Sequence, residues 1–209
     1  PLGFWQRVQA MPMPSFDTKP GQAVWVSSNC RSTYGRQGIV QKLMRHMRVD
    51  ARGKCLNNAE RFPGNYGVGL EKGYATYKFV ISMENSVETD WATEKFHLPF
   101  EANALPVYYG APNIDNFAPG PKSFVNMRDF DSVESLAYHL LDLAQNETKY
   151  LEYFQWRHTQ SEQPTLQRER EELSYRRPDI LCGICDCICD KSCSGNTSAL
   201  PSTPTVPQQ

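Results

Sequence analysis

The fold is decided by the stretch Tyr77-Lys78-Phe79-Val80-Ile81-Ser82-Met83-Glu84-Asn85-Ser86 and by Asp90-Trp91-Ala92-Thr93-Glu94-Lys95-Phe96, which follows it. Its apolar run predicts a buried strand ending at Met83, and a helix is expected from about Trp91. The N-terminus of a helix offers unpaired N–H groups and a positive dipole end to an anionic ligand. An isolated Thr-Glu-Lys would be no more than an ion pair on a solvated helix, because such tripeptides are common.

Short apolar strands alternate with helical segments on both sides of this stretch. Strands are expected at 23–26, 49–50, 105–109 and 123–126, and helices at 36–47, from 131 and at 149–157, with a loop at 52–68. Asp131 is the expected cap of the helix from 131, and Pro99 should kink or shorten the helix from Trp91. This alternation is typical of an α/β fold with a mostly parallel sheet. Ligands of such sheets bind at the carboxyl ends of the strands.

Both ends of the chain differ from its middle. Residues 1–20, interrupted by Pro12, Pro14 and Pro20, are predicted to be an irregular connecting segment, and 21–158 the folded domain. A charged helix is expected at 159–181, and a cysteine-rich, then disordered tail at 182–209. Because the chain does not begin with Met, we expect a fragment or a processed product.

Composition excludes several classes of protein. The 209 residues are 40% hydrophobic, so the chain can bury a core and is not disordered throughout. Lys and Arg number 22 against 23 Asp and Glu, a balance that argues against a nucleic-acid-binding protein. No run reaches the roughly 20 apolar residues that cross a bilayer.

The seven cysteines and two sequons favour an oxidising compartment. Cys30 and Cys55 stand alone in the sequence, whereas five others crowd near its end: Cys182, Cys185, Cys187, Cys189 and Cys193. Asn146 and Asn196 begin Asn-x-Ser/Thr sequons and are candidate glycosylation sites. Clustered cysteines and sequons together are typical of proteins in a secretory lumen.

The run from Tyr77 to Lys95 resembles the signature of the fucosyltransferase family that moves fucose from GDP-fucose onto α1,3 or α1,4 positions, glycosyltransferase family 10. That family carries a strand close to Tyr-Lys-Phe-x-x-x-Phe-Glu-Asn-Ser and a spacer that ends in Tyr-x-Thr-Glu-Lys. Met83 replaces the family's Phe in this sequence. Trp91 stands where the family usually has Tyr, which keeps an aromatic face and removes a hydroxyl.

The resemblance extends from about Ala23 to Arg157. The stretch 105–114 is similar to Val-Pro-Val-x-x-Gly-Ala-Pro-Asn-Ile, in a wording nearest to the members that fucosylate the N-glycan core. Upstream, Ser28-Asn29-Cys30 and Arg36 resemble the family's Ser-Asn-Cys turn and the Arg beyond it. Asn103 stands where the family usually ends a helix with Gly, and Asn is the next best residue for a left-handed cap. Other matching segments are 117–119, 123–125, 129–130 and 153–157.

The resemblance implies a two-domain GT-B fold, of which this chain holds the Rossmann-like, donor-binding C-terminal half. The implied reaction is an inverting transfer of fucose from GDP-fucose to a GlcNAc hydroxyl in α1,3 linkage. Positive charge at the leaving diphosphate favours such a step. By position in the motifs, the implied ligand contacts are Arg36 and Lys95 with the diphosphate, Glu94 and Trp91 with the ribose, and Glu84 and Asn85 at the sugar end. The general base is expected in the N-terminal half, so no catalytic residue is assigned here.

The family binds its donor without the Asp-x-Asp metal motif, and Asp129-Phe130-Asp131 is better explained by a helix cap at Asp131. We therefore expect no required metal or other cofactor, although a divalent cation could assist. Expected partners are GDP-fucose and a glycoprotein N-glycan acceptor. The expected location is the Golgi lumen, as part of a type II membrane protein with an anchor upstream.

Cys182-Gly183-Ile184-Cys185 is similar to the Cys-x-x-Cys that forms disulfides in many family members. A zinc cluster or reduced thiols are the alternatives, and the spacing is too tight for the usual two-knuckle zinc site. Two other functions stay open beside the enzyme. They are a catalytically incomplete nucleotide-sugar-binding fragment and a cysteine-tailed protein-binding module.

Overall fold

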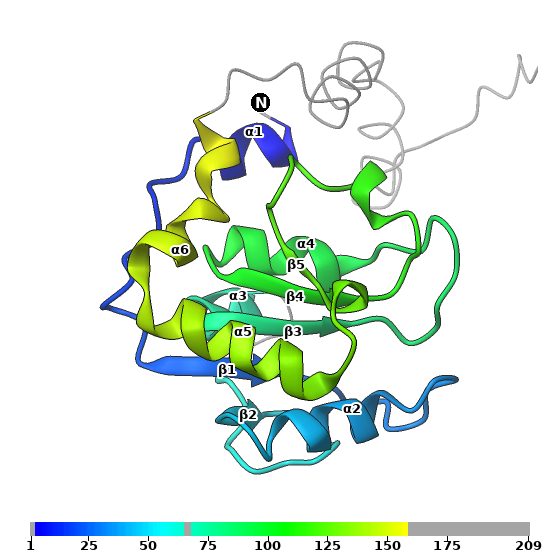
Figure 1. Cartoon of the computed structure of the whole chain (residues 1–209). Coiled ribbons are helices and arrows are strands. Elements are labelled where there is room, and N and C mark those ends of the chain that lie inside the picture. The colour runs from blue at the N-terminus through cyan, green and yellow to red at the C-terminus, as the bar shows by residue number, and fades with distance from the viewer. Residues whose placement is uncertain (1–2, 65–67, 159–209) are drawn as a thin grey trace, which may run out of the picture. The chain divides into compact units, whose positions relative to one another are not determined.

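The computed structural model describes residues 3–64 and 68–158, which contain a five-stranded sheet with helices on both faces (Figure 1). Every pair of neighbouring strands is parallel, and the strand order is β2-β1-β3-β4-β5. The strands are β1 Gly21–Trp25, β2 Val49–Ala51, β3 Tyr77–Met83, β4 Leu105–Tyr109 and β5 Val125–Asn126. The predicted α/β fold with a parallel sheet is confirmed.

The central strand β3 is buried along almost its whole length because helices cover both faces of the sheet. Side chains of one strand alternate between the two faces. Phe79 and Ile81 pack against α2 Arg36–Leu43, α5 Val133–Gln145 and the residues of α6 Glu147–Glu152. Val80 packs on the opposite face against α3 Val68–Tyr74 and the end of α4 Glu94–Glu101.

Two short helices were not predicted. The segment 1–20, expected to be irregular, contains α1 Phe4–Gln9, and Trp5 of this helix packs edge-to-face on Phe100 and Trp156. The helix α3 begins at Val68, where the predicted loop ends. Helices of six or seven residues are too short to be stable alone, so contacts with the rest of the domain stabilise them.

Four predicted helix boundaries were wrong. The helix expected at 36–47 is α2, which ends at Leu43. The helix expected from Trp91 begins at Glu94, because Thr93 is its N-cap. Ser132, not Asp131, caps α5: its hydroxyl accepts a hydrogen bond from the N–H of Ser135 at 3.0 Å, while the Ser135 hydroxyl lies 3.2 Å from the Ser132 N–H. The helix expected at 149–157 is divided into α6 and a 3-10 turn, η3 Gln155–Arg157. Two further 3-10 turns are η1 Ile114–Asn116 and η2 Met127–Asp129.

Two residues singled out in the sequence, Pro99 and Asn103, lie at the end of α4 and are compatible with its termination there. Pro99 lies within the last turn of a helix of only eight residues. Asn103 has a φ of 56°, the left-handed conformation expected of it. Its amide also donates to the carbonyl of Pro12 at 3.1 Å and accepts from Arg157 at 2.7 Å.

The predicted charged helix at 159–181 and the tail at 182–209, with its five cysteines and Asn196, lie outside the described residues. Asn146 is the N-cap of α6, where its side-chain oxygen accepts a hydrogen bond from the N–H of Lys149 at 3.0 Å. Its glycosylation stays a prediction. Among the helices of residues 3–64 and 68–158, none combines the length and the apolar character that a membrane span requires.

Candidate functional site

The strands β1 and β3 are neighbours in the sheet, and the strands that follow them in the chain, β2 and β4, lie on opposite sides of this pair. From β1 the chain passes through α2 to β2 on one side, and from β3 it passes through α4 to β4 on the other. The helices α2 and α4 pack on opposite faces of the sheet. Such a switch point is where open parallel sheets bind their ligands.

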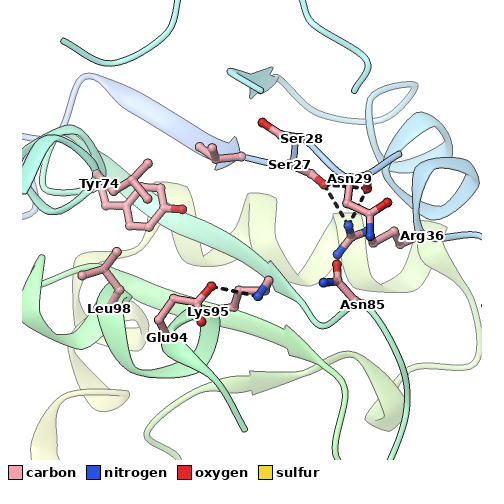
Figure 2. A pocket seen from close by; sticks show the side chains of 11 residues that line it. Ser27, Ser28, Asn29, Arg36, Tyr74, Asn85, Glu94, Lys95 and Leu98 are labelled. Atoms are coloured by element: carbon pink, nitrogen blue, oxygen red, sulfur yellow. Dashed lines mark hydrogen bonds and ion pairs between the residues drawn. The ribbon is translucent and has the colours of Figure 1, made fainter. Parts of the chain in front are cut away.

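A cavity of about 250 Å³ lies at this point (Figure 2). Four of the six residues that the resemblance assigned to GDP-fucose line it: Arg36, Asn85, Glu94 and Lys95. Glu84 and Trp91 do not. Ser27, Ser28 and Asn29 also line it, and they form the turn after the strand predicted at 23–26, an expected ligand-binding end. The remaining lining residues were not predicted; they are Val26, Leu70, Tyr74 and Leu98. Tyr74 and Leu70 could not have been found from the sequence pattern, because their helix α3 was not expected.

Arg36 joins the ends of the two strands that flank the cavity. One terminal nitrogen, Nη2, donates to the Ser27 hydroxyl at 2.9 Å and to the Asn29 carbonyl at 2.6 Å (Figure 2). The other, Nη1, donates to the carbonyls of Met83 and Glu84 at 3.1 and 3.2 Å. Burial lowers the pKa of this guanidinium, but a guanidinium stays charged in proteins. The site therefore contains a fixed positive charge.

The Nε of Arg36 and the Oδ1 of Asn85 are buried and have no hydrogen-bond partner among the described residues. Both side chains line the cavity, one from the start of α2 and one from the end of β3. Buried polar atoms in folded proteins are almost always paired. An unpaired donor and an unpaired acceptor in one cavity lining are what a polar ligand would satisfy.

Glu84 is fully buried and is not part of the cavity lining; its carboxylate contacts the start of α4 instead. Its carboxylate accepts a hydrogen bond from the N–H of Thr93 at 2.9 Å, and the Thr93 hydroxyl lies 2.8 Å from its Oε2. Thr93 is the N-cap of α4, so its contact with Glu84 fixes the position of Glu94 and Lys95, the two residues after Thr93. The predicted contact of Glu84 with the sugar stays a prediction.

Lys95 lies among three oxygen atoms of its own chain. Its ammonium nitrogen is 2.9 Å from Oε1 of Glu94, 3.1 Å from the Thr93 hydroxyl and 3.6 Å from Oε2 of Glu84. The side chain is 28% exposed, so its ammonium can be reached from the cavity. In Figure 2, Lys95 and Asn85 point toward the same space.

Trp91 is 48% exposed and lies outside the cavity lining. It follows Asp90, whose φ of 62° is left-handed. The side chain of Asn113 fixes that residue by donating to its carboxylate at 2.7 Å and accepting from its N–H at 3.0 Å. The ring is thus presented on a loop fixed at its base, and its predicted contact with ribose stays a prediction.

Cys30 and Cys55, which stand alone in the sequence, form a disulfide with a Cα–Cα distance of 5.3 Å. The bond ties the loop after β1 to the loop after β2. A signal for it was available: each cysteine follows a strand of the parallel pair β1 and β2, and parallel strands end at the same edge of a sheet. The bond encloses the loop that accepts hydrogen bonds from Arg36.

Gly53 allows the same two loops to approach closely. A Cβ on this residue would lie 1.9 Å from the carbonyl oxygen and 2.6 Å from the nitrogen of Ser27. No side chain fits there without moving backbone. The cavity wall formed by Ser27 and Ser28 is therefore supported by both a covalent bond and a close backbone contact.

Residues 16–200 match the family described as the C-terminal part of glycosyltransferase family 10 (fucosyltransferase). The chain belongs to glycosyltransferase family 10. The predicted family is thereby confirmed. Part of the match lies beyond the residues that the structure describes, but the strands, the cavity and the disulfide all fall within it.

Known fucosyltransferases are similar in sequence and in structure. A GDP-fucose protein O-fucosyltransferase 3 of Danio rerio is 35% identical over 141 residues, which are 65% of this chain and 31% of that protein. An alpha-(1,3)-fucosyltransferase B of Drosophila melanogaster is 34% identical over 140 residues, 63% of this chain and 32% of that protein. A crystal structure of an alpha1,3-fucosyltransferase with GDP-fucose superimposes with a TM-score of 0.58 at 26% identity, covering 65% of this chain and 38% of that one.

This family 10 chain spans about a third of the length of these relatives. The superposition covers 38% of the chain of the structural relative, and it confirms a fold of the fucosyltransferase GT-B type. Within residues 3–64 and 68–158, His, Cys, Asp and Glu side chains form no group of three or more that could hold a metal ion.

Proposed function

We propose that this chain is the donor-binding part of a fucosyltransferase and that GDP-fucose binds in the cavity between the ends of β1 and β3. The observation that carries the proposal is the convergence of Arg36, Asn85, Glu94 and Lys95 on one cavity at the switch point. A similar structure was determined with GDP-fucose, and another with GDP.

The chemistry of the cavity suits the diphosphate and ribose of such a donor. Lys95 supplies a mobile point charge beside the N-terminus of an eight-residue helix, whose dipole also favours an anion. Arg36 adds a fixed charge close by, with its Nε still to be paired. The carboxylate of Glu94 can accept hydrogen bonds from ribose hydroxyls.

In the reaction that we propose, the acceptor hydroxyl attacks C1 of fucose with inversion while GDP leaves. Charge near the departing diphosphate would lower the barrier of this step. The required general base must lie within hydrogen-bond reach of the acceptor hydroxyl. We assign it to the part of the protein that this chain does not include.

Two acceptor classes are candidates. The motif at 105–114 and the alpha1,3-fucosyltransferase relatives favour a GlcNAc hydroxyl of a glycoprotein glycan in α1,3 linkage. The relatives named GDP-fucose protein O-fucosyltransferase 3 favour a hydroxyl on a protein. The location that we propose for either reaction is the Golgi lumen, as part of a type II membrane protein. The Cys30–Cys55 disulfide supports the oxidising compartment in this proposal.

Titration calorimetry with GDP tests the donor site. We expect Lys95→Ala to weaken GDP binding about ten-fold, because a charge-assisted hydrogen bond contributes about 1.5–3 kcal/mol. Lys149→Ala is the matched control, since Lys149 is an exposed lysine paired with Asp142 on the surface. Equal affinities of Lys95→Ala and the wild type for GDP would contradict the proposed site.

A transfer assay tests the activity and the acceptor. The chain is joined to the upstream part of a family 10 relative and offered radiolabelled GDP-fucose with either an N-glycan or a folded protein acceptor. Label on one acceptor identifies its class, and Glu94→Ala should remove most of the transfer. Binding of GDP with no transfer to any acceptor would favour a nucleotide-sugar-binding fragment. Loss of GDP binding altogether would favour a protein-binding module.

A further inference from the structure

A second cavity, of about 390 Å³, lies around the edge strand β5 and shares no lining residue with the first. Its lining comes from η1, from β5 and the residues on both sides of it, from α5 and from the turn after α6. The lining residues are Asp115, Lys122, Phe124, Val125, Asn126, Asp129, Phe130, His139 and Tyr153. Neither the sequence patterns nor the proposed donor site accounts for it.

The aromatic part of this cavity is firmly held. Nε2 of His139 is 2.9 Å from the Tyr153 hydroxyl, and the ring of Phe130 packs on the imidazole at a centroid distance of 5.2 Å. Tyr153 and Phe124 are each buried in a hydrophobic cluster of the domain. Burial and the nearby charge of Lys122 and Lys149 lower the pKa of His139, although Asp142 opposes them. The imidazole is therefore neutral at neutral pH, and this wall adds no charge.

The polar groups of the cavity carry both signs. The carboxylates of Asp115 and Asp129 are exposed acceptors. Lys122 is a cation that pairs with Glu152 and lies 5.3 Å from the centroid of the Tyr153 ring. Glu152 already compensates the charge of Lys122, so an anion would gain no free cation and would meet the two aspartates, whereas a cation over the ring would meet the Lys122 ammonium. Neither a cationic nor an anionic ligand would meet only opposite charges in this cavity.

A neutral ligand with many hydroxyls avoids this conflict, because each hydroxyl both donates and accepts. The volume lies within the range of about 300–1,000 Å³ that is typical of small-molecule sites. Mixed donors and acceptors beside a fixed aromatic wall suit a sugar ring, which has polar edges and less polar faces.

We propose that the cavity around β5 binds a neutral saccharide and serves as a subsite for the glycan of the acceptor. The role as an acceptor subsite rests on the proposed fucosyltransferase function, whereas saccharide binding itself does not. The subsite is separate from the nucleotide cavity, so occupation of one leaves the other accessible.

An NMR titration of the 209-residue chain with N,N′-diacetylchitobiose tests the inference. We expect shifts at His139 and Tyr153 that occur equally with and without saturating GDP. Asp129→Ala should weaken the binding about five-fold, the effect of one typical hydrogen bond. Asp131→Ala is the matched control: it removes the same charge two residues away, from an exposed position outside the cavity.

Absence of shifts at millimolar chitobiose in a chain that still binds GDP would overturn the inference and leave the proposed donor site intact. Equal weakening by Asp129→Ala and Asp131→Ala would also overturn it, since only overall charge would then matter. Binding of a lysine-rich peptide in place of the saccharide would do the same. Saccharide binding by a chain that does not bind GDP would support the inference and contradict the donor site instead.

Discussion

Glu84 and Thr93, nine residues apart, are joined by three contacts that connect the end of β3 to the start of α4. The N–H of Thr93 donates to the Glu84 carboxylate at 2.9 Å, and the Thr93 hydroxyl lies 2.8 Å from its second oxygen. A buried carboxylate at the end of a strand thus supports the N-cap of the next helix. The two residues that α4 contributes to the cavity by its first turn, Glu94 and Lys95, depend on this contact for their position.

We predict that the two residues are coupled in stability. Thr93→Ala should lower the free energy of unfolding by about 1 kcal/mol, as loss of an N-cap does. Glu84→Ala should cost about 2 kcal/mol, because it leaves buried donors unpaired. The loss of unfolding free energy in the double variant should be smaller than the sum of the two single losses by at least about 0.5 kcal/mol. Urea denaturation of the four proteins measures this difference.

Ser132→Ala supplies the control for that experiment, since Ser132 is the cap of α5 and has no contact with Glu84 among those that the structure describes. Its cost should also be about 1 kcal/mol and should add to that of Glu84→Ala. Additive costs for Thr93→Ala and Glu84→Ala would contradict the coupling.

Two glycines are predicted to respond in opposite directions to the same change. Gly53→Ala places a Cβ 1.9 Å from the Ser27 carbonyl oxygen and should destabilise the chain by about 1–3 kcal/mol. Gly38→Ala lies in α2 with no atom within 4 Å of the new Cβ and should stabilise it by about 0.5–1 kcal/mol. Thermal unfolding of both variants checks the signs, and a Gly53→Ala protein as stable as the wild type would show that the loops are not in close contact.

The disulfide is predicted to contribute to stability in oxidising conditions. Reduction of Cys30–Cys55 should lower the free energy of unfolding by about 2–4 kcal/mol. Denaturation with and without reductant measures the effect, and mass spectrometry without reduction should show the two peptides joined. A variant with both cysteines replaced by Ala should respond less to reductant. An equal response of that variant would assign the effect to other cysteines.

The stability of the domain should rise with pH in the alkaline range because of Lys19. Burial, aided by the charges of Lys78 and Arg157, lowers the pKa of Lys19 to about 8, whereas the unfolded chain keeps this proton to about pH 10.4. Between these values the unfolded state binds more protons, so the free energy of unfolding increases with pH. Below pH 8 both states are protonated and the contribution is constant.

Comparison with Lys19→Met isolates this effect. The free energy of unfolding of the wild type relative to the variant should rise by about 2 kcal/mol between about pH 8 and pH 10. Lys149→Met, at an exposed position, should show no such rise relative to the wild type. A constant difference between the wild type and Lys19→Met would contradict the lowered pKa.

Much of the sheet could be predicted from the sequence. The strand β4 has the predicted ends, and β3 begins one residue earlier than expected, because strands buried on both faces are continuous apolar runs. The helices α1 and α3 could not be predicted, because six or seven residues show no clear periodicity. Their positions depend on distant partners, such as Phe100 and Trp156 for Trp5.

The predicted part of the candidate site comes from the motif at 77–95 and from the turn and Arg36 that follow the first strand. Arg36, Asn85, Glu94 and Lys95 converge because the carboxyl ends of parallel strands share an edge. The Cys30–Cys55 pair could have been expected from the position of each cysteine after a strand of the pair β1 and β2, but the burial of Glu84 depends on distances between segments, which a single sequence does not give. The cavity around β5 was missed for the same reason, since five separate segments line it.

The ion pairs of Lys95 with Glu94 and Glu84 bear on how the site would distinguish one nucleotide ligand from another. The ammonium lies 2.9 Å from the Glu94 carboxylate and 3.6 Å from that of Glu84, so its charge is already paired within the chain. A diphosphate that binds there must replace Glu94 as the partner of Lys95. That exchange would release the Glu94 carboxylate at the moment when a ribose hydroxyl arrives beside it. Recognition of phosphate and of sugar would then be cooperative, and neither guanosine nor inorganic diphosphate alone could gain both contacts.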